Sequence, residues 1–233
     1  MLKLSLLVAS SLGGVLAIGS FTTANAFTAY VVPSNTAGNQ EEFGGVLGMD
    51  FNVNSNITVT DLGVFDDLSN GISSGGTLTA ELWTRVNNAT GVLLGSQTFT
   101  NANPGTLDGG SRFKSISPLS LVPGSYTIVS YGYSSSNPNG NGRGGVPPWT
   151  TNSGGGAISF VGSSRYGGPL GASIGTTIDA GPANQYAAGT FKATVVPVPE
   201  SQPLSILGAM TVLGLGIALK RRSLDNTKKN RGL

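Results

Sequence analysis

The chain has 233 residues and contains neither cysteine nor histidine. This composition removes Cys–His nucleophile pairs, imidazole bases and the usual zinc, copper or haem ligand sets, so we expect no cofactor and no enzyme activity. The sequence pI is about 9.0, yet residues 27–196 carry six lysines and arginines against nine carboxylates, a net charge of −3. Because the positive excess lies in the two ends, it predicts an orientation in a membrane rather than a nucleic-acid partner.

Residues 1–26 have the pattern of a secretory signal peptide. Lys3 precedes an apolar stretch over 4–18, and Ala24-Asn25-Ala26 provides the small-x-small pattern that signal peptidase accepts. Cleavage there would leave Phe27 as the mature N-terminus. The alternative is an uncleaved N-terminal membrane anchor, but the apolar stretch is short for a span and no basic stop-transfer signal follows it.

The following residues, 27–196, are enough for one domain with its own core. Short runs with period-two alternation are separated by Gly, Asn, Ser and Pro clusters, and no sustained helical period occurs. The pattern predicts an all-β fold, a single antiparallel, jelly-roll-like β-sandwich of about eight strands. The predicted strands lie within 49–54, 57–65, 77–86, 92–99, 112–116, 125–133, 157–161 and 186–196.

A glycine- and proline-rich window over 137–171 interrupts this pattern. It holds eleven glycines and four prolines, which disfavour regular structure through backbone entropy and lost hydrogen-bond donors. We expect a long surface excursion containing one short strand, 157–161. Two interpretations stay open, a poorly ordered loop and a ligand-binding loop.

The C-terminal region combines three features in a fixed order. Val198-Pro199-Glu200 follows the last predicted strand, the uncharged stretch 203–219 comes next, and Lys220-Arg221-Arg222 closes it. Seventeen helical residues reach about 25 Å, close to the roughly 30 Å of a hydrocarbon core. The cations are expected to stay in the cytoplasm, with 223–233 as a basic cytoplasmic tail and the β domain outside the membrane.

Residues 197–222 resemble the PEP-CTERM sorting signal of bacteria, including cyanobacteria. That family carries a Val-Pro-Glu-Pro-like motif, a hydrophobic helix and an Arg-rich end. Here Ser201 stands in place of the second proline, and eleven residues follow Arg222. The resemblance implies that an exosortase-type membrane protease recognises Pro199-Glu200 and cleaves nearby. The alternative is a plain C-terminal anchor that is never processed.

The body also resembles a recurrent class of exported bacterial β domains. The stretches that carry this resemblance are 47–53, 57–65, 115–121 and 124–128. The resemblance implies the fold and says little about activity.

Three aspartates form the tightest carboxylate group of the sequence. Asp61, Asp66 and Asp67 supply the hard oxygen ligands that Ca²⁺ prefers, but they lack EF-hand spacing, and a solvated turn after Phe65 is the simpler interpretation. Glu81 together with one of these aspartates would also satisfy the two-carboxylate requirement of a glycosidase.

Two tryptophans are candidates for contact with a glycan. Trp83 falls on the polar side of its predicted strand with Thr79, Glu81 and Arg85, and Trp149 follows two prolines in the glycine-rich window. An exposed indole stacks on a sugar ring, whereas the alternative is that a loop or second sheet covers Trp83.

The sequence thus supports three functional hypotheses. The first is a non-enzymatic surface or extracellular-matrix protein, exported, anchored as a precursor through 203–219, and associated with extracellular polysaccharide. The second is a carbohydrate-binding module in the narrow sense. The third is a secreted glycoside hydrolase that uses carboxylates alone.

Overall fold

The computed structural model describes residues 25–39, 45–141 and 149–197, all within a compact unit bounded by Met1 and Pro197. In these ranges the fold is all-β with antiparallel pairing, and its helical content is one short 3₁₀ turn, Asp67–Ser69. The described part of the chain includes no helix with the length and apolar character that crossing a bilayer requires. The predicted signal segment up to Ala24, the 203–219 stretch, Val198-Pro199-Glu200 and Lys220-Arg221-Arg222 lie outside the described residues.

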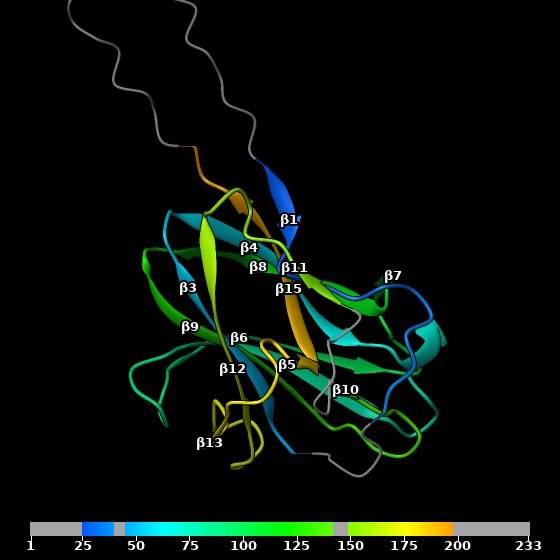
Figure 1. Ribbon diagram of the computed structural model, residues 1–233. Coiled ribbons are helices and arrows are strands. Elements are labelled where there is room, and N and C mark those ends of the chain that lie inside the picture. The colour runs from blue at the N-terminus through cyan, green and yellow to red at the C-terminus, as the bar shows by residue number, and fades with distance from the viewer. Residues whose placement is uncertain (1–24, 40–44, 142–148, 198–233) are drawn as a thin grey trace, which may run out of the picture. The chain divides into compact units, whose positions relative to one another are not determined.

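The first of the two main sheets has five strands (Figure 1). The last strand of the domain lies inside this sheet, between the first strand and β4, so the sheet joins the two ends of the described chain. In spatial order the strands are β1 (Ala26–Thr28), β15 (Gly189–Val195), β4 (Ile57–Phe65), β8 (Ser111–Leu121) and β7 (Thr106–Asp108).

The second main sheet has six strands and packs its inner face on the first. Two short pairs, β2 (Tyr30–Val31) with β11 (Thr150–Thr151) and β10 (Gly140–Asn141) with β14 (Tyr186–Ala187), complete the pairing. The order in the larger sheet is β13 (Thr177–Asp179), β12 (Ile158–Tyr166), β3 (Leu47–Val53), β9 (Gly124–Tyr131), β5 (Thr77–Thr84) and β6 (Leu93–Thr100).

Eight strands of the described residues have seven or more residues, and each overlaps one predicted run. β4 has the predicted bounds. β8 and β12 differ most, because they continue five residues beyond the predicted ends at Ile116 and Val161. The extension of β12 depends on a bulge. The pairing of β12 with β3 shifts register between Phe160 and Ser164, and Gly162 (φ +94°) lies within that bulge. Glycine tolerates this positive φ, so a residue that suggested a strand end instead lets the strand continue.

Strand alternation places the core between the two sheets. In β3, Met49, Phe51 and Val53 are buried in the shared core, while Asp50 and Asn52 point to the opposite face. Phe51 meets Phe191 of the five-stranded sheet at a ring-centroid distance of 4.8 Å. Burying one such ring contributes about 1.5–3 kcal/mol, and the contact unites both sheets.

The turn between β8 and β9 is held by a side chain from the strand that follows it. Val122-Pro123 makes the turn, and the Tyr126 hydroxyl donates back to the carbonyl oxygen of Val122 at 2.9 Å. This is the arrangement of a tyrosine corner, which fixes the point where a chain crosses between sandwich sheets. The strands on either side belong to different sheets, so the bond helps to set their relation.

Candidate functional site

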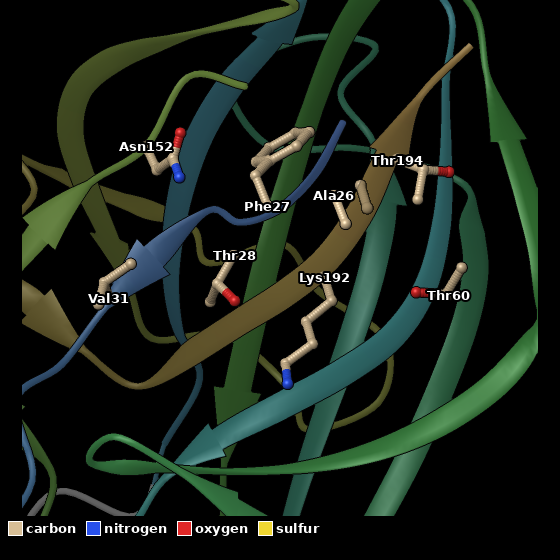
Figure 2. A pocket seen from close by; sticks show the side chains of 9 residues that line it. Ala26, Phe27, Thr28, Val31, Thr60, Asn152, Lys192 and Thr194 are labelled. Carbon is tan, nitrogen blue, oxygen red and sulfur yellow. The ribbon is translucent and has the colours of Figure 1, made fainter. Parts of the chain in front are cut away.

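The outer face of the five-stranded sheet carries two depressions of about 410 and 510 Å³. Lys192 on β15 lines both of them, and we call the two adjoining depressions together the Lys192 groove. Figure 2 shows the Lys192 side chain extending across the sheet between Thr28 of β1 and Thr60 of β4. The first depression is lined by Ala26, Phe27, Thr28, Val31, Thr60, Asn152, Lys192, Ala193 and Thr194, and the second by Asp61, Gln97, Asn103, Gly105, Thr106, Phe113, Lys114, Ser115 and Lys192.

Lys192 is held in place by two neighbours. Its ammonium nitrogen lies 2.7 Å from Oδ2 of Asp108 and 4.4 Å from the ring centroid of Phe113. The ring itself is 4% exposed and packs over Gly63, where an added Cβ would lie 2.7 Å from the ring. Gly63 therefore creates the space for Phe113, and Phe113 supports the ammonium group by a cation–π contact.

The second depression contains a fixed hydrogen-bond network. Asp61 accepts bonds from the hydroxyls of Thr60 and Ser115, each at 2.8 Å. The Gln97 amide on β6 donates to the backbone oxygen of Ser115 at 2.9 Å, which links the edge of the six-stranded sheet to β8. The side chains thus occupy defined positions before any ligand arrives.

A second link joins the same two strands. The Lys114 ammonium donates to the carbonyl oxygen of Thr98, and it lies 5.0 Å from the ring centroid of Phe99. Partial burial lowers the pKa of Lys114 from its ordinary value.

The Lys192 groove has a mainly polar lining. Hydroxyls, side-chain amides, two ammonium groups and two carboxylates offer both donors and acceptors, and Lys192 is already neutralised by Asp108. Such a lining can exchange hydrogen bonds with a polyhydroxylated chain. The paired charges give the groove no strong preference for an anionic or a cationic ligand.

Trp83 and Glu81 lie on the other side of the molecule, on the outer face of the six-stranded sheet. Trp83 lies on the polar side of its strand, as predicted. Of the two alternatives for its side chain, exposed or covered, the structure shows the covered one, because the residue is 7% exposed. Its indole nitrogen donates to Oε2 of Glu81 at 3.1 Å, and the Tyr131 hydroxyl donates to Oε1 at 2.9 Å. Ile174, from the loop that follows β12, packs in the same small apolar cluster.

Trp149 is covered as well, at 8% exposure. Its indole nitrogen donates to the backbone oxygen of Asn184 at 2.8 Å, and its ring packs closely against the backbone of Gly140. In this structure neither indole presents an open face, so the Lys192 groove is the surface better suited to a glycan.

The three predicted calcium ligands do not converge. Asp61 lies in the Lys192 groove, whereas Asp66 accepts from the Gly71 amide at 2.9 Å and from the Arg112 Nε at 2.7 Å. Asp67 accepts from the amide of Gly38 at 2.6 Å. Among the described residues no three carboxylates are grouped closely enough to hold a metal ion.

The proposed pairing of Glu81 with an aspartate for glycoside hydrolysis is also not assembled. Glu81 points away from the core on β5 of the six-stranded sheet, and Asp61 lies on the outer face of the five-stranded sheet. The two carboxylates are therefore on opposite faces of the paired sheets, which themselves pack about 10 Å apart.

A buried ion pair beneath the loop after β12 was not foreseen from the sequence. Arg165 on β12 is 1% exposed and donates through Nε to Asp50 of β3 at 2.7 Å, and Asp50 also accepts from the Thr127 hydroxyl at 2.6 Å. Arg85 approaches the same carboxylate at 3.5 Å. Alternation predicts that Asp50 faces away from the core, but no sequence signal connects it to a cation 115 residues away.

Comparisons with known proteins add little. No family model matches the chain, and no curated protein matches it. Among solved structures, the chain is similar to the infectious bursal disease virus VP2 subviral particle, with a TM-score of 0.27 and 14% identity over 93% of this chain and 54% of that one. The T13 viral particle of the same virus gives a TM-score of 0.25 and 13% identity over 93% and 51%. The chain thus spans about half the length of these structures.

Proposed function

We propose that this protein is a non-enzymatic surface or extracellular-matrix protein, exported by its signal peptide and processed through its PEP-CTERM-like tail. The observation that carries the proposal is the agreement between the folded domain and the two predicted processing segments. The first strand begins at Ala26, the predicted cleavage residue, and the last ends at Val195, three residues before Val198-Pro199-Glu200. The core residues of the described chain all lie between Phe27 and Val195.

The pairing of the first and last strands supports the same order of events. Phe27 pairs with Ala193 and Thr28 with Lys192, and this pairing remains when cleavage after Ala26 removes the Ala26–Thr194 pair and the bond from the Val195 amide to the Asn25 carbonyl oxygen. Both processing segments therefore adjoin one end of the domain. A protease acting at that end would release a folded unit with its core intact.

The proposal also includes the jelly-roll-like order of the strands. A jelly-roll-like winding is supported by the five connections at which consecutive long strands change from one sheet to the other; two of them are the short turns 54–56 and 122–123.

The sorting step is tested by changing the motif in the bacterium that makes the protein. Replacing Pro199 and Glu200 with alanine should keep the protein in the membrane fraction and deplete it from the surface and medium. Thr227→Ala, in the 223–233 tail and outside the motif, is the control and should leave the distribution unchanged. Equal distribution of all three forms would refute recognition of this motif.

A second function, binding of a neutral polysaccharide, is favoured by the Lys192 groove. The lining of hydroxyls and amides, together with the neutralised Lys192–Asp108 pair, suits a polyhydroxylated and uncharged chain. Because the groove is shallow and open, we expect weak binding along an extended ligand rather than capture of a single sugar.

Calorimetry with a soluble neutral glucan tests this assignment. Lys192→Met should weaken binding about tenfold, since a hydrogen bond from a charged donor contributes about 1.5–3 kcal/mol. Thr177→Ala, at an exposed position of β13 on the other sheet, should bind like the unchanged protein. Equal affinities for the two variants, or stronger binding of an anionic polysaccharide, would contradict it.

A further inference from the structure

One end of the domain is almost free of charge. It comprises the turns 54–56, 122–123 and 152–157, the two ends of the 85–92 turn (85–86 and 92), and Val196-Pro197, which we call the terminal rim. The middle of the 85–92 turn folds over the outer face of the six-stranded sheet, where the Asn88 carbonyl oxygen accepts from Arg165 and Gly91 lies beside Ile174. The strand register places the segments of the rim at the same end, because Ala26 pairs with Thr194, Ile57 with both Val195 and Leu121, and Val53 with both Gly124 and Ile158. Thr84, just before 85–92, pairs with Tyr126 close to the same turn.

The terminal rim contains one charged residue, Arg85. That guanidinium approaches the buried carboxylate of Asp50 at 3.5 Å, so its charge is countered within the domain. The opposite end carries Asp66, Asp67, Asp108 and Arg112, with Asp66 paired to Arg112 and Asp108 paired to Lys192, each at 2.7 Å. The opposite end therefore holds more charged groups than the terminal rim does.

The most exposed large apolar side chains also gather on the terminal rim. Val86 is 68% exposed, and Val92 and Val122 are each 60% exposed, which are the highest values for large apolar residues in the described chain. Val196 adds a fourth at 38%. These valines come from two separate turns, 85–92 and 122–123, and from the chain end, so no single local motif explains their common location.

The rim also adjoins the point where the C-terminal region leaves the domain. Pro197 ends the described chain, and the uncharged stretch 203–219 begins six residues later. A fully extended link of that length spans about 20 Å. If 203–219 enters a bilayer, as the proposed function requires, the domain is tethered by this end.

We propose that the terminal rim rests on the lipid bilayer while the precursor is anchored. This inference rests on the proposed function and adds the orientation of the domain to it. An uncharged surface avoids the cost of desolvating ions at the interface, and exposed valines gain from burial among acyl chains.

The absence of cysteine makes the orientation directly measurable. Single cysteines at Val86, Val122 and, as a matched apolar control at the opposite end, Leu68 (48% exposed) accept an environment-sensitive fluorophore. A fourth label at Val212 reports insertion of the tail. The chain, purified from membranes, is reconstituted into phosphatidylcholine–phosphatidylglycerol vesicles with and without nitroxide-bearing lipids.

The proposal predicts blue-shifted emission and nitroxide quenching at Val86, Val122 and Val212, and neither effect at Leu68. Quenching at Val212 with unquenched rim labels would overturn the orientation but leave the anchoring intact. Rim labels that become blue-shifted without lipid quenching would indicate contact with a second copy and would also overturn it. An unquenched Val212 label would refute membrane anchoring together with this inference.

A charge substitution provides an independent readout. In the chain labelled at Val86, Val122→Glu should reduce nitroxide quenching, because the new carboxylate is disfavoured at the interface. Leu68→Glu, which adds the same charge at the far end, should leave the quenching unchanged. Equal quenching in both variants would contradict contact between the rim and lipid.

Discussion

Two buried tyrosines differ in the hydrogen bonding of their hydroxyl groups. The hydroxyl of Tyr133 accepts from the Phe65 amide at 3.1 Å and donates to the Ala188 carbonyl oxygen at 2.8 Å. The hydroxyl of Tyr30, which is 2% exposed, has no hydrogen-bond partner among the residues that the structure describes. A buried hydroxyl without a partner costs free energy, whereas a satisfied one contributes it.

The two tyrosine-to-phenylalanine variants should therefore change stability in opposite directions. Tyr133→Phe should lower the free energy of unfolding by about 1–2 kcal/mol, because the Phe65 and Ala188 groups lose a partner. Tyr30→Phe should raise it by up to about 1–3 kcal/mol, since it removes an unpaired polar atom. Urea denaturation of both variants measures the difference, and equal shifts would contradict the assigned environments.

The stability of the domain should also depend on the buried Arg165–Asp50 ion pair. Arg165→Met should lower the free energy of unfolding by about 3 kcal/mol. Breaking a buried ion pair typically costs about 3–5 kcal/mol, and we expect the lower end because Arg85 still approaches Asp50 at 3.5 Å. Lys192→Met breaks the more exposed pair with Asp108 and should cost less than about 1 kcal/mol. Comparable losses in denaturant titrations of the two variants would argue against a structural role for the buried pair.

At the level of strands, the turn geometry after β9 limits substitution. Gly132 has φ +95°, and an added Cβ would lie 2.1 Å from the carbonyl oxygen of Thr77 at the start of β5. Gly155 has φ +72°, but nothing lies within 4 Å of an added Cβ. Comparing alanine substitutions at these two glycines distinguishes the effect of steric overlap from the effect of backbone strain.

Gly155→Ala should cost about 1–2 kcal/mol, the usual penalty for placing an L-residue in the left-handed region. Gly132→Ala should cost clearly more, because the β5 backbone must move to admit the methyl group. Thermal unfolding of both variants provides the comparison. A Gly132 variant as stable as the Gly155 variant would show that the close approach to Thr77 is not maintained.

Strand positions were predictable where local alternation is decisive, as in Ile57–Phe65. The extension of β12 to Tyr166 was not, because it depends on a bulge that only a partner strand can define. β1 was also missed: three residues carry too little periodicity, and their pairing with β15 joins positions more than 160 residues apart.

The candidate site was less predictable than the fold. Trp83 was correctly placed on the polar face, but the sequence does not reveal that Ile174 packs beside it and the loop after β12 covers it. The Lys192 groove arises from strands that are distant in sequence, so its lining has no local motif.

For the whole molecule, buried tyrosines link stability to alkaline pH. Burial raises the pKa of both Tyr30 and Tyr133 above the ordinary value. The fold therefore favours their protonated forms, and the free energy of unfolding should be unaffected by these groups below about pH 10 and should fall above it. Formation of tyrosinate, followed by ultraviolet absorbance, should coincide with loss of the β-sheet circular dichroism signal. Full ionisation of all tyrosines with the sheet signal intact would contradict this link.

The central claim about the whole molecule is that a folded β domain is delivered by a removable leader and a removable tail. The claim predicts a definite mass for the mature protein. The first strand begins at Ala26, the last ends at Val195, and Val198-Pro199-Glu200 follows shortly after it. Both ends of the mature protein can be read from one spectrum.

Intact-mass analysis of the protein recovered from the native envelope and medium is the most direct test. The account predicts a species that begins at Phe27 and ends near Glu200. A species that retains the tail to Leu233 would indicate a plain anchor, and one that also begins at Met1 would contradict export by a cleaved signal peptide.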